Sequence, residues 1–262
     1  MENSKIAWTD NTFNPWIGCT KVSDGCLHCY AESQDHRWGH DRWGKGKTRT
    51  LTSKATWDKV LTWNKEARET GIQKKVFCAS MADIFDQEVP VEWRHKLFNH
   101  INLAPYLTWL LLTKRAQEQR LWLDEQYTDT PPHIWAGVTI ESQKNIGRIY
   151  ELERMKAAVR WISYEPSLGP LVIPNDVRVD WVICGGESGN GARHFNLRWA
   201  RDLRDQCKER RIAFFMKQLG SNWGGEAFEG RDLNSRNKWD KPEEWPEDLR
   251  VREFPASATL CL

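Results

Sequence analysis

The sequence lacks an excess of either charge. Its 262 residues carry 38 Lys and Arg against 36 Asp and Glu, so the net charge at neutral pH is only +2. A balance this even excludes the strongly basic surface that would by itself require a nucleic-acid partner. Internal repeats and low-complexity tracts are also missing, and the length suits one large domain or two small ones with a substantial core.

Long apolar runs are missing too. The longest, "YLTWLLL" at residues 106–112, has the length of a strand and falls far short of a membrane span. The first ten residues lack the charged-then-apolar order of a signal peptide. Seven cysteines are an odd and unevenly spaced number, which argues against a disulfide framework. We therefore expect a soluble cytoplasmic protein, without membrane contact, whose reduced thiols are available to a metal.

Tryptophan, by contrast, is abundant, with 16 residues. Many of them flank charges, as in "DHRWGHDRWGKGK" at residues 35–47. One interpretation is that most are packing residues whose indole N–H finds a partner. The other is a stacking surface for bases or an aromatic wall around a cofactor.

Short apolar runs alternate with polar or amphipathic stretches over most of the chain. The runs that we expect to be strands are residues 74–80, 107–113, 133–141, 159–166, 179–187 and 212–220. The stretches that we expect to be helices are residues 89–103, 114–127, 143–158 and 197–211. A loop, residues 167–176, follows the fourth strand. One more strand near residues 16–20 is expected before the cysteines, with a helix from about Tyr30.

This alternation is typical of a parallel sheet covered by helices, because strands buried on both faces are nearly continuous in apolar residues. Six or seven such units fit an open doubly wound sheet or a β/α barrel. We predict an α/β fold with parallel strands over residues 1–220, in one of these two architectures. An irregular C-terminal extension, residues 221–262, is expected to pack on this domain, and residues 30–54 form a second irregular segment.

Polar, charged or glycine-rich residues follow almost every expected strand. They are residues 80–83, 113–115, 141–142, 165–166, 185–189 and 217–218. Loops are often polar, so each group alone is weak evidence. The carboxyl ends of parallel strands meet at one edge, however, and a carboxylate or Lys at nearly every end predicts a lined cavity there.

The stretch "NPWIGCTKVSDGCLHCYAE", residues 14–32, contains Cys19, Cys26 and Cys29. Two residues between the last two cysteines let both sulfurs face one metal, and "SDG" is turn chemistry that can return the first. A closed zinc site would need a fourth ligand such as His36 or His40. A four-iron cluster held by three cysteines leaves one iron open. We favour the cluster, because an open iron has a use for a lined cavity. The three thiols could instead be free and packed in the core, or include a redox pair.

The cysteine loop, ending in "CLHCY", resembles that of the radical S-adenosylmethionine (SAM) enzymes. Its first gap of six residues differs from the usual three of that superfamily. Further blocks between residues 8 and 220 are similar to those of a phage-borne family, itself similar in outline to the spore photoproduct lyase branch. These blocks are "FCASMADIFDQEVP", "LLLTKRAQ", "GVTIESQKNIGRI", "ISYEPSLGPL" and "GGESGNGARHFNLRWARDLRDQC".

The resemblance implies a partial (β/α)6-type barrel over residues 1–220, with residues 19–29 as its cluster loop. It implies that Cys19, Cys26 and Cys29 ligate a [4Fe–4S] cluster whose open iron chelates SAM. It implies an enzyme that cleaves SAM reductively to a 5′-deoxyadenosyl radical, which abstracts hydrogen from a substrate. An external one-electron donor of the flavodoxin or ferredoxin type would reduce the cluster. In this interpretation the three cysteines are the catalytic and metal-binding residues.

The resemblance also places a set of polar residues around SAM: His28, Tyr30, Ser80, Asp83, Lys114, Glu141 and Ser142. The first two would contact the adenine or pack the cluster, and the next two would bind the SAM amino group. Asp83 fits that role as an acceptor for an ammonium. Lys114 would face the SAM carboxylate or the substrate. The last two residues would hold the ribose hydroxyls.

The tripeptide "GGE" at residues 185–187 follows the fifth strand after the cysteine loop, so it does not take the SAM-ammonium role that a similar tripeptide has in the superfamily. We expect Gly185 to permit close approach of a ligand and Glu187 to turn into the cavity. A plain strand-to-helix turn is the alternative. Arg193 would meet an anionic substrate group or the SAM carboxylate. Glu165 would orient a ligand hydroxyl, or alternatively pair with Arg193 or Lys217.

The substrate is suggested only by composition. Basic and aromatic residues interleave in residues 35–54 and 231–239, which fits phosphate pairing and base stacking by a nucleic acid or nucleotide. A solvated surface is the alternative for each segment. Cys184, Tyr106 and Tyr164 are candidates for a radical relay only if they face the cavity.

Two further classes of function remain open. A zinc-stabilised nucleic-acid-binding module without catalysis would carry one zinc per chain. An iron–sulfur enzyme that transfers the aminocarboxypropyl group of SAM would release methylthioadenosine. Redox sensing by the cysteines is a third possibility, which predicts reversible disulfide formation without metal.

Overall fold

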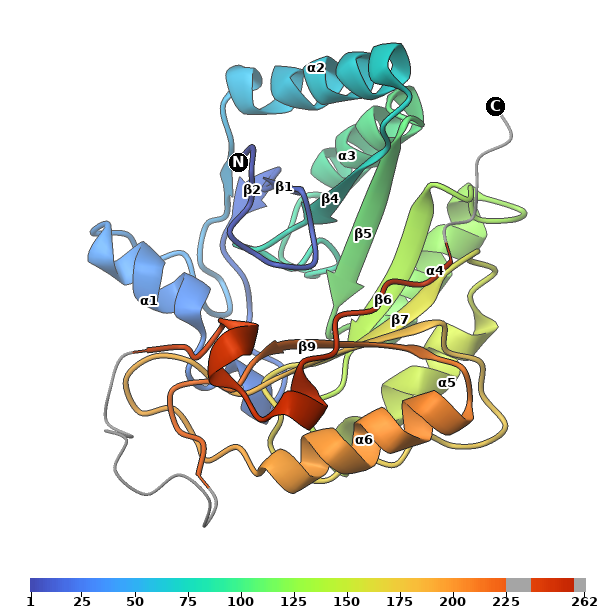
Figure 1. Cartoon of the computed structure of the whole chain (residues 1–262). Helices are drawn as coiled ribbons and strands as arrows, with labels where there is room; N and C mark the ends of the chain where they lie inside the picture. Colours follow the sequence, from blue (N-terminus) through green and yellow to red (C-terminus); the bar gives the residue numbers. More distant parts are fainter. Residues whose placement is uncertain (225–236, 257–262) are drawn as a thin grey trace.

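A computed structural model of the chain describes residues 1–224 and 237–256. Its main sheet contains seven strands: β1 (Asn11–Phe13), β4 (Lys74–Cys78), β5 (Leu107–Thr113), β6 (Ile134–Thr139), β7 (Arg160–Tyr164), β8 (Trp181–Gly185) and β9 (Ala213–Gln218). All neighbours are parallel, and each strand lies beside the one before it, in the order β1-β4-β5-β6-β7-β8-β9. The order of a doubly wound sheet reverses partway. The curled sheet in Figure 1 therefore confirms the predicted partial barrel.

Helices cover the outer face of the curled sheet (Figure 1). They are α3 (Val91–Leu103), α4 (Ala116–Gln126), α5 (Gly147–Arg154) and α6 (Leu197–Glu209). The expected helix 143–158 is split into a 3-10 turn, Gln143–Asn145, and α5. Residues 165–180 join β7 to β8 as an irregular segment, as the sequence predicted. Short 3-10 turns also lie at Asp24–Cys26, Pro242–Glu244 and Glu247–Leu249.

The concave face of the sheet has an aromatic floor. Because side chains alternate along a strand, each strand sends one set to the helices and the other to the concave side. On the concave side Trp8, from the N-terminal segment, packs on Phe77 and Trp161 with ring centroids 4.6 and 5.4 Å away. Gly137 makes room for this packing, since a Cβ there would lie 2.2 Å from the Trp161 ring. At this level of the strands the concave side is therefore filled with packed side chains.

Most tryptophans are packing residues, because twelve of the sixteen are buried. The expectation that each buried indole N–H finds a partner is wrong at several positions. The N–H groups of Trp8, Trp16, Trp57 and Trp122 are buried without a hydrogen-bond partner. Trp38 is instead 51% exposed and remains available for stacking.

The region before residue 74 is more regular than the sequence analysis proposed. The first strand of the main sheet is β1, not residues 16–20. Strand β2 (Trp16–Ile17) pairs instead with β3 (Thr50–Leu51) in a separate antiparallel sheet. The helix expected from about Tyr30 is confirmed as α1 (Tyr30–Arg37). The segment 30–54, otherwise expected to be irregular, also contains β3.

A helix that the sequence analysis missed, α2 (Lys54–Thr70), follows β3. It buries Trp57, Val60, Trp63 and Ala67, a spacing of three to four residues that predicts an amphipathic helix. It ends at Gly71, whose φ of +68° is the left-handed conformation typical of a helix C-terminus.

The described part of the C-terminal segment runs along the edge strand β9. The N–H of Met216 donates to the carbonyl of Val251, and the N–H of Leu219 to that of Trp239, at 2.8 and 3.0 Å. These contacts cover an edge that would otherwise present unpaired backbone groups. Residues 225–236 and 257–262 of the predicted extension lie outside the described residues, as does most of the basic segment 231–239. Within the described part of the chain, no helix is long and apolar enough to cross a membrane.

Candidate functional site

The cysteine loop, residues 19–29, lies at the carboxyl edge of the sheet. Gly18 forms a parallel bridge with Ala82, just beyond the end of β4, and its N–H donates to the carbonyl of Met81 at 3.1 Å. The loop ends at Cys29, the residue that precedes α1. The fold therefore carries the loop to the edge where the polar strand ends were expected to meet.

The three thiols of the loop are half-buried and free. Cys19 and Cys29 pack against the same small apolar cluster, which includes Trp43 and Met81. Burial raises the pKa of Cys19 to about 12 and also raises the pKa of Cys29. Within residues 1–224 and 237–256, no group of three or more His, Cys, Asp or Glu is arranged to hold a single metal ion. The thiols lie on one loop without converging on one point.

Contacts from the loop and from Tyr30, the residue directly after it, reach the ends of three strands. Ser23 Oγ donates to Glu141 beyond β6 at 2.6 Å, and Tyr30 Oη donates to the carbonyl of Ser80 beyond β4 at 2.7 Å. His28 Nδ1 lies 3.1 Å from Glu187 Oε2 beyond β8. The structure thus brings several residues singled out in the sequence together with the cysteine loop, although they lie up to 159 positions apart.

Glu141 is a fully buried carboxylate beneath the loop. Arg148 Nη1 donates to its Oε2 at 2.8 Å, and Lys114 Nζ lies 3.8 Å from its Oε1. Gly25 of the loop passes directly over it, since a Cβ there would lie 2.5 Å from the carboxylate. Glu141 is therefore paired with Ser23, Arg148 and Lys114, whereas the sequence led us to expect that it holds a SAM ribose.

Glu187, His28 and Arg193 form a second connection between the loop and the barrel. Arg193 donates from its backbone N and from Nε to Glu187 Oε2, both at 2.9 Å, and from Nη1 to the carbonyl of Asp24 at 2.9 Å. Burial by itself raises the pKa of Glu187, but the hydrogen bonds from Arg193 and His28 outweigh it, so the net pKa is lowered. The carboxylate of Glu187 is buried and holds Arg193 at this edge.

Asp83 is buried, and protein groups occupy both of its oxygens. It accepts from Thr113 Oγ1 at 2.7 Å, from the N–H of Lys114 at 3.1 Å and from Arg115 Nη1 at 2.9 Å. A SAM ammonium would have to displace one of these donors. Ser80, the other residue expected at that ammonium, exchanges hydrogen bonds with the side chain of Asn14.

Glu165 and the glycines beyond β8 are also close to protein atoms. Lys217 Nζ lies 2.9 Å from Glu165 Oε1, so this carboxylate forms one of the ion pairs considered for it from the sequence. A Cβ on Gly185 would lie 2.5 Å from that same oxygen, and one on Gly186 would lie 2.1 Å from the carbonyl of Leu219. The space beside these glycines, which was expected to admit a ligand, is therefore occupied by other atoms of the chain.

The candidate relay residues do not face the concave side. Cys184 and Tyr164 belong to the helix-covered core together with Cys78, and Tyr106 packs against that core from outside. Tyr164 donates its hydroxyl to the carbonyl of Gly169. A radical relay would need a side chain that faces the cavity. These residues therefore do not meet that condition.

Several residues at this edge were not predicted from the sequence. Arg115 contacts both Cys19 and Asp83, and Arg49 and Asp86 complete a buried network with it. Arg148 holds Glu141. The only signal for Arg115 was its place directly after β5, in the strand end "TKR". Arg49 gave no such signal, because it lies in the segment expected to be irregular.

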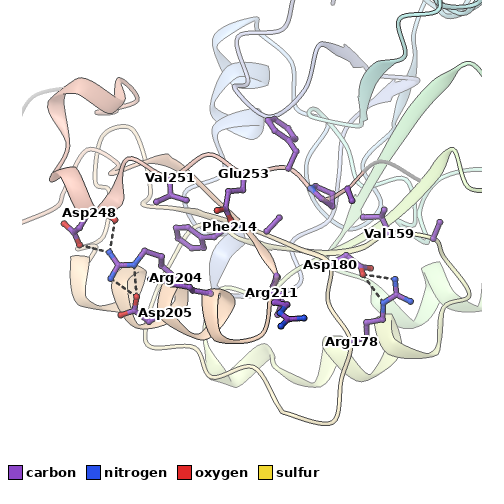
Figure 2. A pocket seen from close by; sticks show the side chains of 17 residues that line it. Val159, Arg178, Asp180, Arg204, Asp205, Arg211, Phe214, Asp248, Val251 and Glu253 are labelled. Carbon is purple, nitrogen blue, oxygen red and sulfur yellow. Dashed lines mark hydrogen bonds and ion pairs between the residues drawn. The ribbon is translucent and has the colours of Figure 1, made fainter. Parts of the chain in front are cut away.

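Two cavities differ in their relation to the cysteine loop. The smaller, about 360 Å³, is lined by Lys21, Ser23, Asp24, Leu27, Leu168, Arg193 and His194. The larger, about 1020 Å³, is lined by residues just before β7, β8 and β9, by the start of β9, and by parts of α6 and of residues 248–256, so it lies at the amino edge. Figure 2 shows several of its charged side chains paired with one another, Arg178 with Asp180 and Arg204 with Asp205 and Asp248. The cavity near the thiols is therefore the smaller one.

Comparison with known proteins gives one family and a set of structures of similar fold. A family model described as "Protein of unknown function (DUF5131)" matches residues 3–248. No curated protein matches the chain. Three similar solved structures are a spore photoproduct lyase mutant, that lyase complexed with dinucleoside spore photoproduct, and a mutant of it with bound AdoMet and the same dinucleoside. Identities are 13–14% and TM-scores 0.47, covering 80–84% of this chain and 58–64% of theirs.

Proposed function

The chain belongs to the DUF5131 family, and we propose that it is a radical SAM enzyme whose Cys19, Cys26 and Cys29 hold a [4Fe–4S] cluster. The carrying observation is the position of the three-cysteine loop, which contacts the ends of β4, β6 and β8 at the carboxyl edge of a parallel half-barrel. Ligands of parallel α/β folds bind at this edge. The loop therefore lies where a cofactor would meet a substrate.

The donor set fits a cluster better than a zinc ion. A structural zinc needs four ligands that converge on one point, and the described residues offer no such group. A four-iron cluster can be held by three thiolates, which leaves one iron open, and the loop supplies three. All three thiols are half-buried, and Cys19 and Cys29 pack beside Trp43 and Met81. When bound, the group supplies the electron that cleaves SAM.

The residues of the edge divide into two roles in this proposal. Glu141 and Asp83, whose oxygens are occupied by protein donors, hold the loop in place. Lys114, Lys217 and Glu165 belong to the strand ends of the same edge and would contact SAM and substrate. His28 and Tyr30 flank the last cysteine and would pack on the adenine, and Ser142 would hold a ribose hydroxyl.

The substrate class we propose is a nucleic acid or nucleotide. Beside the cysteine loop, the end of α1 and the residues after it expose Arg37, Trp38, His40 and Lys45. An aromatic ring among cations provides base stacking together with phosphate pairing. Other members of the basic segment have structural roles, because Trp43 and Arg49 are buried. An external one-electron donor would complete the reaction.

The test is anaerobic purification with iron and sulfide quantified. We expect about four irons per chain, as a four-iron cluster requires, and loss of all of them when Cys19, Cys26 and Cys29 are replaced by Ala. Cys207→Ala is the matched control, since that thiol is buried on α6 away from the loop, and it should keep its iron.

The next measurement is the product formed from SAM under reducing conditions. Formation of 5′-deoxyadenosine agrees with the proposal, whereas methylthioadenosine would indicate transfer of the aminocarboxypropyl group. A colourless protein with one zinc per chain would contradict the radical mechanism and leave a zinc-stabilised binding domain.

A further inference from the structure

A buried network of four charged side chains lies beneath the first cysteine of the loop. It consists of Arg49, Asp83, Asp86 and Arg115, each at most 8% exposed. Arg115 donates to Asp83 Oδ2 at 2.9 Å and to Asp86 Oδ1 at 3.2 Å, and Arg49 Nη2 donates to Asp86 Oδ2 at 2.8 Å. The two positive and two negative charges balance, which is the condition under which buried charges are tolerated.

The network holds every polar group of Thr20, the residue after Cys19. The N–H of Thr20 donates to Asp86 Oδ2 at 3.1 Å, and its carbonyl accepts from Arg115 Nη2 at 2.9 Å. Its hydroxyl accepts from Arg49 Nη2 at 2.5 Å. Three contacts from three side chains leave this residue, and with it the backbone of Cys19, very little freedom.

Arg115 joins this network to the sulfur itself. Its Nη1 lies 3.9 Å from Cys19 Sγ while donating to Asp83, and its Nη2 reaches Thr20. Arg presents its donors in a rigid planar fork, so fixing one end of the guanidinium on two carboxylates fixes the direction of the rest. Apolar side chains could close this part of the fold without the cost of burying four charges. An apolar side chain, however, could not direct a hydrogen-bond donor at the sulfur of Cys19.

We propose that Arg115 is a positioning residue: held by Asp83 and Asp86, it fixes the Cys19 side chain and keeps a hydrogen-bond donor against its sulfur. The first part, that Arg115 fixes the Cys19 side chain, concerns the protein without any metal. The second part, that a donor is kept against the sulfur, rests on the proposed function. A hydrogen-bond donor to a ligating sulfur stabilises the more negative, reduced state of a cluster, and it therefore raises the reduction potential of the cluster.

The test compares three variants with the wild type. Asp83→Asn combined with Arg115→Gln removes the guanidinium while keeping the network electrically neutral. Arg115→Lys keeps the charge but loses the fork. Arg120→Gln is the control, because Arg120 lies on the helix that follows Arg115 and pairs with Asp124 and Glu151, away from the loop.

The first readout is alkylation of each thiol by iodoacetamide in metal-free protein, mapped by mass spectrometry. We expect Cys19 to react about tenfold faster in the double variant, because its segment opens locally, with buried Cys78 unchanged. Arg115→Lys should be intermediate and Arg120→Gln equal to the wild type. Equal Cys19 rates in all four proteins would overturn the proposal, and so would a parallel rise at Cys78, which indicates general unfolding.

The second readout is the reduction potential of iron-loaded protein. We expect it to be more negative in the double variant than in the wild type and the Arg120→Gln control. An unchanged potential overturns the tuning part of the proposal. Failure of the wild type to bind iron overturns the proposed function instead, while the alkylation ratios, measured without metal, still decide whether Arg115 positions Cys19.

Discussion

The two edges of the half-barrel both carry many charges, and they use them differently. At the carboxyl edge, Glu141 has no exposed side-chain area, and its partner Ser23 lies 118 positions away in the sequence. At the amino edge, Arg178 is 62% exposed and pairs with Asp180, two positions away. The carboxyl edge joins distant segments through buried ions. The ion pairs of the amino edge are partly exposed, whether the partners are neighbours or, as with Arg204 and Asp248, lie 44 positions apart.

This difference shows that the size of a cavity does not identify a site in this protein. The amino edge has the larger hollow, about 1020 Å³, but its charges neutralise one another at the surface (Figure 2). Buried ion pairs are costly and are weak contributors to net stability, so their concentration under one loop indicates that the position of that loop matters. Exposed ion pairs contribute little to stability, and their presence does not indicate that the position of a segment matters.

Removing one charge from each edge should give the largest contrast between them. Glu141→Ala should lower the free energy of unfolding by about 3 to 5 kcal/mol, because it leaves Arg148 and Lys114 near a buried site without their carboxylate. Arg178→Gln should cost about 1 kcal/mol or less, because its pair is exposed. Urea unfolding of the wild type and the two variants measures both losses. Equal losses would mean that the edges do not differ.

Gly25→Ala tests the carboxyl edge without changing any charge. The added Cβ would lie 2.5 Å from Glu141, so the loop or the carboxylate must shift, at a cost of about 1 to 3 kcal/mol. The companion variant Gly39→Ala, in the segment after α1, meets open space but has a φ of +77°, so its cost is one of backbone strain alone. We expect only Gly25→Ala to change the alkylation rate of Cys26. An unchanged rate would show that the loop does not rest on Glu141.

The smallest expected effect is in the pH dependence of stability. The folded pKa of Glu187 lies below its ordinary value of 4.5, so its contribution is present above that pH and is lost as the pH falls through the folded pKa. Asp248 at the amino edge also has a lowered pKa, caused first by its hydrogen bond from Arg201, but it is 43% exposed. Glu187→Gln should therefore flatten the acid limb of stability against pH more than Asp248→Asn does. Chemical denaturation between about pH 3 and pH 7 measures this, and the reverse ranking would contradict the contrast between the edges.

Much of the fold could be predicted from the sequence because its signals are local. The apolar runs at residues 107–113 and 74–80 predicted β5 and β4, and the alternation with amphipathic helices predicted the parallel half-barrel. The larger errors in the predicted elements fell before residue 74. There the strands β2 and β3 are two residues long and are defined only by pairing with each other, which no local pattern indicates.

The candidate site was predictable by type and location but not by partner. Polar residues after strands predicted the edge, and three spaced cysteines predicted the loop. Which carboxylate holds which donor could not be read from the sequence, because Glu141 and Asp83 are equally good acceptors for a ligand or for the protein. Arg49 and Arg115 were missed for the same reason, since an arginine becomes a structural cation only when the fold buries it beside a carboxylate.

The alternation of strands and helices after residue 74, the apolar faces of most helices and the grouping of three thiols within eleven residues follow from the amino-acid sequence alone, because they depend on neighbours along the chain. Three features needed the folded chain: Trp8 closes the floor of the barrel, Gly25 crosses Glu141 and Arg115 reaches Cys19. Those contacts join segments up to 173 positions apart in the case of Trp8 and Trp181, and their energy comes from burial and charge pairing after the chain has folded.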